Sequence, residues 1–182
     1  MKFIELARKR ESCRAYSAQP VEREKLMYCF DAARVAPSAC NSQPWRYVAV
    51  TEKDKVEEMV KCVYDGVLPI NRFAREVPVF VAVVEGAAKL SAKISGKAND
   101  QKYAQMDIGL SVENFCLAAA EQGLGTCIMG WFKEDKVKML LGIPEGLKVR
   151  LVLAVGYPND PQPREKVRRS LEDTVCFEKY SF

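Results

Sequence analysis

The chain has 182 residues, of which 48% are hydrophobic and 29% are charged, and its formal net charge is +4. A chain of this length and composition can bury a conventional core without disulfides, which argues against a disordered protein or a disulfide scaffold. The sequence contains no histidine, so we exclude imidazole-dependent triads and H-E-x-x-H zinc sites and expect no metal site. We expect one domain spanning residues 1–182.

Hydrophobic periodicity predicts five helices and three strands. In chain order these are helices at about residues 2–9 and 22–34, a strand at 46–51, a helix at 53–63, a strand at 78–84, helices at 101–122 and 133–141, and a strand at 148–156. Because helices outnumber strands and helical segments separate the strands, we expect a central sheet with helices packed on its faces.

The residues after Gly156 are polar and rich in proline, which predicts an extended arm over residues 157–182. The apolar side chains near its end have little local surface against which to pack. These are Leu171, Val175, Phe177 and Phe182. We therefore expect the arm to embrace a second subunit.

The cysteines and the apolar segments indicate a cytoplasmic protein. The chain has seven cysteines, an odd number, with no C-x-x-C pair, as expected of free thiols in a reducing compartment. The longest strongly apolar run, residues 77–84, is much shorter than the ~20 residues of a membrane span. Residues 1–11 have the pattern of an amphipathic helix. We expect neither a signal peptide nor a membrane anchor.

Two short segments carry the chemistry. Arg10, Ser12 and Arg14 alternate, so in an extended backbone all three side chains project from one side and suit an elongated anionic ligand. A solvated basic helix end is an equally natural interpretation of this segment alone. Residues 36–46 crowd prolines and hydrogen-bonding side chains between a helix and a strand, which suits recognition of a planar heterocycle. The alternative is an ordinary connecting loop with a core tryptophan.

The glycines of residues 123–130 do not match G-x-G-x-x-G, and they follow a helix instead of a strand, so a Rossmann phosphate loop is excluded. A helix end that leads into a strand explains Gly123 on its own and could explain Gly125 as well. The basic clusters at residues 8–10 and 164–169 lack an interleaved aromatic stripe, so a small phosphorylated ligand is at least as natural as nucleic acid.

Together these motifs resemble the nitroreductase family of FMN enzymes. The pattern R-x-S-x-R at residues 10–14 is followed by A-P-S-x-x-N-S-Q-P-W at residues 36–45. The resemblance continues through Asn71, the segment Asp107-Ile108-Gly109, residues 123–131 and the basic tail that ends at residues 170–173. It implies a nitroreductase-like α+β fold, with a central mixed or antiparallel sheet flanked by helices. It also implies that FMN is bound at the interface of a homodimer.

The resemblance also implies which residues bind FMN. One subunit would contribute Arg10, Ser12, Arg14, Asn71, Met129, Gly130, Lys166 and Arg168. The other subunit would contribute Pro37, Ser38 and Asn41. Arg10, Lys166 and Arg168 would lie near the phosphate, since guanidinium groups are its best bidentate partners. Arg14 would face the pyrimidine side of the ring, and the backbone of Met129 and Gly130 would approach the flavin near N5.

Many larger relatives carry an acidic residue at the position of Met129, so any side-chain role there is absent from this chain. The implied activity is hydride transfer from NAD(P)H to a small electron-poor acceptor, such as a nitroaromatic or a quinone, by a ping-pong mechanism. The flavin carries the chemistry, so we expect no catalytic side chain and no catalytic cysteine. The alternatives are a flavin-binding or redox-sensing protein with little turnover and a related flavin enzyme such as a reductive dehalogenase. We expect neither nucleic acid nor a membrane as a partner.

Overall fold

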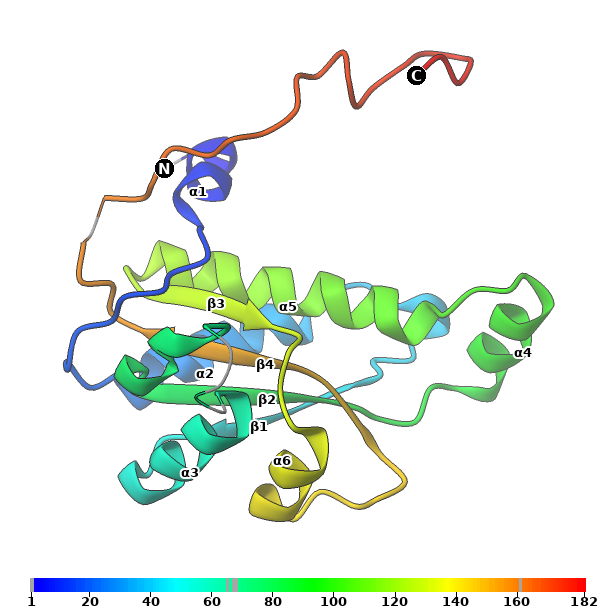
Figure 1. The fold of residues 1–182 in the computed structure, drawn as a ribbon. Coiled ribbons are helices and arrows are strands. Elements are labelled where there is room, and N and C mark those ends of the chain that lie inside the picture. Colours follow the sequence, from blue (N-terminus) through cyan, green and yellow to red (C-terminus); the bar gives the residue numbers. More distant parts are fainter. Residues whose placement is uncertain (1, 65, 67–68, 161) are drawn as a thin grey trace.

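The computed structural model describes residues 2–64, 66, 69–160 and 162–182. Its centre is a four-stranded sheet in the order β1-β2-β4-β3 (Figure 1). The strands are β1 (Trp45–Val50), β2 (Val79–Glu85), β3 (Gly125–Met129) and β4 (Lys148–Gly156). Every neighbouring pair of strands is antiparallel. The expected α+β fold is therefore confirmed, and of the two expected kinds of sheet the structure has the antiparallel one.

Helices cover both faces of this sheet (Figure 1). The described helices are α1 (Phe3–Lys9), α2 (Arg23–Arg34), α3 (Lys53–Val63), α4 (Leu90–Ala98), α5 (Tyr103–Glu121) and α6 (Glu134–Leu141), with short 3-10 helices η1 (Ala39–Asn41) and η2 (Arg72–Glu76). Alternate residues of β2 enter two separate cores, because successive side chains of a strand point to opposite faces. Val79, Val81 and Val83 pack toward α2 and α5, whereas Phe80 and Ala82 pack on the other side.

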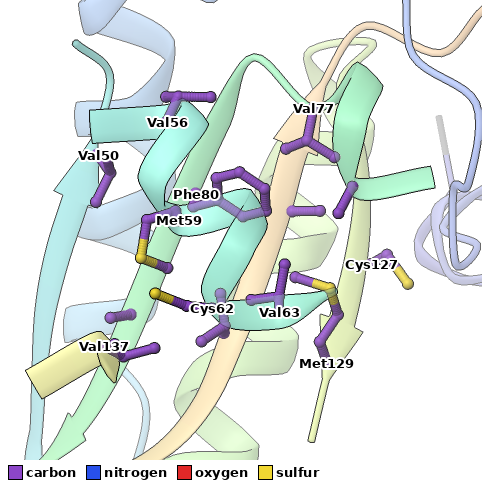
Figure 2. Close-up of a cluster of buried hydrophobic side chains, with 14 of the residues drawn as sticks. Val50, Val56, Met59, Cys62, Val63, Val77, Phe80, Cys127, Met129 and Val137 are labelled. Carbon is purple, nitrogen blue, oxygen red and sulfur yellow. The ribbon is translucent and has the colours of Figure 1, made fainter. Parts of the chain in front are cut away.

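That second core lies between the sheet and helices α3 and α6 (Figure 2). Met59 and Val63 of α3 are four positions apart, so they lie on one face of the helix and reach the sheet together. Val137 of α6 and Phe80 of β2 are fully buried beside them. Met129, at the end of β3, belongs to the same cluster, and its side chain is 3% exposed.

The predicted boundaries agree with the structure to within two residues, and β4 matches its predicted range. One α-helix and one strand of the described structure are missing from the predicted list, although the alternative interpretation of Gly123 already implied a strand after it. Helix α4 buries only Ala92 and Gly96, so its sequence lacks a strong apolar stripe. Strand β3 has five residues and follows a glycine-rich turn, so its sequence has the appearance of a loop.

The arm is extended, as predicted. Within the described residues after Gly156 no helix or strand forms, apart from one isolated bridge between Tyr16 and Pro158. Pro161 lies outside the described residues. The arm passes α1 and then leaves the body of the protein (Figure 1). Leu171 is 75% exposed and Phe177 is 80% exposed, so these side chains contribute nothing to the core of their own chain. No helix in the described part of the chain is long and apolar enough to cross a bilayer.

Candidate flavin site

The segment after α1 is held in an extended conformation against β3. Helix α1 ends at Lys9, and Arg10 at its C-cap already has extended dihedral angles. Ser12 then forms a parallel bridge with Thr126, and the N–H of Cys13 donates to the carbonyl of Thr126 at 2.9 Å. This pairing fixes the extended backbone that carries the alternating side chains of Arg10, Ser12 and Arg14.

The arm closes over this segment and forms a cavity of about 320 Å³, which we call the cationic cavity. Arg10, Ser12, Arg14, Lys166 and Arg168, all predicted cofactor ligands, line it together. The remaining lining residues are Glu11, Arg164, Glu165 and Val167. The structure therefore brings together two groups of predicted residues that are separated by about 150 positions in the chain.

Arg10 leaves one buried donor of the cationic cavity unsatisfied within the described residues. Arg10 has a side chain that is only 18% exposed, and its Nε lies 3.3 Å from the Glu113 carboxylate. The Nε atom is nevertheless buried without a hydrogen-bond partner among the described residues. Burial, reinforced by the positive charges of Arg10 and Arg168, lowers the pKa of Lys166. Crowded cations and an unsatisfied donor fit an anionic group such as a phosphate monoester.

Lys166 and Arg164 hold the arm in place. Lys166 Nζ donates to the carbonyl of Ala7 at 2.7 Å and also to the carbonyl of Arg10. Arg164 donates to the Glu11 carboxylate at 2.9 Å and to the carbonyl of Ser12 at 2.7 Å. Arg164 was not among the predicted site residues. Its only signal in the sequence is membership of a basic run, which does not indicate which cation turns inward.

The loop that carries Pro37, Ser38 and Asn41 has an unusual backbone. Cys40 and Asn41 have φ values of 53° and 50°, and Gln43 has a φ of 46°, a region that non-glycine residues seldom occupy. Ser38 stabilises the turn, because its Oγ accepts the N–H of Gln43 at 2.9 Å. Such strained loops are common at ligand sites, where surrounding contacts hold the conformation.

This loop does not line the cationic cavity of its own chain. Arg10 faces α5 at Glu113, whereas Ala39 in the loop contacts α5 at Asp107. Six positions along a helix correspond to about 9 Å along its axis and place the two contacts on different sides of it. One chain therefore presents the two predicted halves of the site separately.

The remaining predicted residues lie together near the end of β3. Asn71 adopts a left-handed backbone with φ 61°, and its Nδ2 donates to the carbonyls of Val63 at 3.1 Å and Trp131 at 2.8 Å. Gly130 is exposed, and a Cβ added there would meet no described atom within 4 Å. Because the side chain of Met129 is buried in the core (Figure 2), only its backbone is available to a ligand.

Comparison with known proteins identifies the family of the chain. Residues 7–157 match the nitroreductase family. The chain belongs to that family. This nitroreductase-family oxidoreductase is 30% identical over 180 residues to the iodotyrosine deiodinase of Thermotoga neapolitana, covering 90% of this chain and 93% of that protein. It is 33% identical over 155 residues to the "Putative NADH dehydrogenase/NAD(P)H nitroreductase" of Archaeoglobus fulgidus, covering 83% and 82% of the two chains.

Solved structures show the same fold. A nitroreductase family protein from Clostridium difficile 630 has a TM-score of 0.78 and 27% sequence identity, covering 99% of this chain and 100% of that one. The fold and the family are therefore those expected from the sequence, and the chain is an NAD(P)H oxidoreductase of the nitroreductase type. The residues that bind its cofactor are not assigned by these comparisons and remain a prediction.

Proposed function

We propose that the protein binds FMN and transfers hydride from NAD(P)H to a small electron-poor acceptor, such as a nitroaromatic or a quinone, by a ping-pong mechanism. The observation that carries this proposal is the cationic cavity, where the buried Nε of Arg10 has no hydrogen-bond partner among the described residues. Cations outnumber the two glutamates that line this cavity, and a terminal phosphate offers the matching negative charge and acceptor oxygens.

The residues that one subunit contributes to the proposed site have distinct roles. Arg10 and Arg168 would bind the phosphate, and Lys166 would add positive charge from its position at the end of α1. Arg14, exposed in the same cavity, would lie toward the pyrimidine side of the ring, where a cation favours the reduced, anionic flavin. When bound, FMN supplies the hydride-accepting and hydride-donating chemistry. The protein supplies placement through the backbone of Met129 and Gly130 and through Ser12 and Asn71.

We further propose a homodimer in which Pro37, Ser38 and Asn41 reach the flavin of the partner subunit. The separation of this loop from the cationic cavity within one chain supports a composite site. Helix α5 also leaves large apolar side chains in solvent, with Met106 53% exposed and Leu110 49% exposed. A second subunit would bury these side chains together with the apolar end of the arm.

A second candidate is reductive dehalogenation, which is favoured by the similarity to the iodotyrosine deiodinase over 90% of the chain. The same cationic cavity and the same flavin would serve both reactions, so the acceptor alone distinguishes them. A redox-sensing protein would bind FMN with negligible turnover of any acceptor.

The first test is the absorption spectrum of the purified protein, followed by heat release and chromatography of the cofactor. We expect FMN; release of FAD or a colourless, flavin-free preparation that FMN cannot reconstitute would contradict the proposal. Steady-state oxidation of NADH and NADPH should then be measured with menadione, a nitrofuran and diiodotyrosine in parallel. Turnover of the first two supports the proposed activity, turnover confined to diiodotyrosine supports dehalogenation, and no turnover supports a sensor.

A further inference from the structure

Asp107 is a buried acidic residue at the start of α5, and the proposed function does not assign it a role. The residue is 6% exposed, and its Oδ2 accepts a hydrogen bond from the backbone N–H of Ala39 at 3.1 Å. Desolvation raises the pKa of the Asp107 carboxyl, and the bond from Ala39 offsets only part of that effect. Burial of a carboxylate with one neutral donor is costly, so a role in packing alone does not explain this residue.

The position of Ala39 indicates what the hydrogen bond does. Ala39 is the first residue of η1 and lies between Ser38 and Asn41, which the proposed function places on the partner's flavin. The loop has three non-glycine residues with positive φ, and a conformation of this kind persists only when surrounding contacts impose it. It therefore needs anchors outside itself.

The hydrogen bonds of the loop divide into internal and external ones. Within the loop, the N–H of Asn41 donates to the carbonyl of Ser38 at 2.9 Å, and Gln43 Nε2 donates to Asn41 Oδ1 at 2.7 Å. These bonds shape the turn but do not attach it to the rest of the fold. Across the described residues, the one hydrogen bond that ties the stretch from Ser38 to Asn41 to another element is the bond to Asp107.

Among the described residues, three other external bonds hold the later part of the loop, and the shortest joins the N–H of Gly86 to the carbonyl of Pro44 at 2.7 Å. The N–H of Lys89 donates to Ser42 Oγ at 3.3 Å, and Arg46 donates to the carbonyl of Gln43 at 3.2 Å. Arg46 is exposed, so its bond competes with water. Asp107, in contrast, projects from a 19-residue helix that packs against the sheet and α2, and thus fixes the loop to a rigid element.

We propose that Asp107 is a positioning residue for the flavin site. Its carboxylate holds the N–H of Ala39 and so orients the loop from Pro37 to Asn41 toward FMN bound mainly by a second copy of the chain. This inference rests on the proposed FMN-dependent function. Asp107 itself does not contact the cofactor in this arrangement.

The test compares variants that remove the hydrogen bond from either side. Asp107→Ala deletes the acceptor of the hydrogen bond, and Ala39→Pro deletes its donor. Proline is compatible with position 39 because the preceding residue, Ser38, already has the extended backbone that a following proline requires. Asp107→Asn retains an acceptor oxygen and serves as the conservative variant. Gln105→Ala is the matched control, because Gln105 lies on the same turn of α5 and is exposed.

The measurements are FMN affinity, from quenching of flavin fluorescence, and backbone amide hydrogen exchange with and without FMN. We expect Asp107→Ala and Ala39→Pro each to weaken FMN binding roughly 10- to 150-fold, the range for loss of a hydrogen bond to a charged group. Amide protection should fall across the loop and stay unchanged in β2 and β4. Asp107→Asn should bind FMN within about 3-fold of the unmodified chain, because its amide oxygen accepts the same bond, and Gln105→Ala should bind unchanged.

Wild-type FMN affinity in both bond-deletion variants would overturn the inference. Loss of amide protection throughout the sheet in Asp107→Ala and in Asp107→Asn would also overturn it, since it would assign Asp107 to global stability. Failure of the unmodified protein to bind FMN would instead refute the proposed function. The exchange measurement on the flavin-free protein would still decide whether Asp107 holds the loop.

Discussion

Replacement of Arg10 by alanine tests the phosphate assignment most directly. The Arg10 side chain is 18% exposed, so a phosphate bound to it would be partly shielded from water. Loss of a hydrogen bond to a charged group costs about 1.5–3 kcal/mol, which corresponds to a rise in the Kd for FMN of roughly 10- to 150-fold. The protein should remain folded, because the unpaired partner, Glu113, is 47% exposed and an exposed ion pair contributes little to stability.

The assay is a fluorescence titration of the flavin-free protein with FMN and, separately, with riboflavin, which lacks the phosphate. Arg10→Ala should weaken FMN binding by the stated factor and change riboflavin binding by less than about 3-fold, since only FMN carries the acceptor oxygens. Arg8→Ala is the control, because Arg8 is an exposed basic residue in the last turn of α1 and does not line the cavity. Arg168→Ala should have an effect at the lower end of the range, because its guanidinium is exposed.

Two outcomes would refute this reasoning. Equal weakening of FMN and riboflavin by Arg10→Ala would show that Arg10 supports the ring or the local fold and not the phosphate. An effect of Arg8→Ala as large as that of Arg10→Ala would show that binding depends on general positive charge, and such an effect should also disappear at high salt.

Three further expectations concern the arm, the thiols and pH. Truncation after Tyr157 should abolish dimerisation, because the arm carries the apolar end that the second subunit is proposed to bury, and FMN retention, because the arm carries two proposed phosphate ligands. A yellow, active monomer of the truncated chain in sedimentation would contradict this. Serine replacement of Cys13, Cys40 or Cys127 should keep turnover within a few-fold, and a loss of about two orders of magnitude at any of them would assign a thiol to catalysis. Asp107→Asn should unfold at higher urea concentration than the unmodified chain at pH 7, because the raised pKa of the carboxyl makes its ionised form unfavourable in the fold. That advantage should shrink as the pH falls and Asp107 gains its proton, and a pH-independent difference would show that desolvation of the carboxylate is not its cause.

The sequence predicted the parts of the fold that depend on local pattern. The residues of β4 form a continuous run of β-favouring side chains, and the boundaries of the strand follow directly from that run. Strand β3 depends instead on pairing with β4, in which Thr126 lies opposite Val155, and no local signal encodes that partner. Helix α4 was missed because Ala92 and Gly96 are too small to mark a buried face.

The candidate site likewise combines residues that a local pattern predicts with residues whose positions depend on long-range contacts. The alternation of Arg10, Ser12 and Arg14 is a local pattern, and the structure confirms that these side chains line one cavity. Their meeting with the arm depends on contacts between residues about 150 positions apart, such as that between Arg164 and Glu11. Such pairings depend on the path of the whole chain and have no periodic signature. The basic tail alone therefore did not reveal that Arg164 anchors the arm.

Helix α5 links the two halves of the proposed site. Glu113 faces Arg10, which we assign to the phosphate of one flavin, and Asp107 holds the loop that we assign to the other flavin of the dimer. Both contacts come from one continuous 19-residue helix whose inner face is packed into the core through Ile108 and Phe115. Because the helix is closely packed against the core, its two contact points are held in a fixed relation to each other. The same rigidity explains why the strained loop keeps its conformation: its anchor belongs to the most extensively buried helix of the described chain and not to another loop.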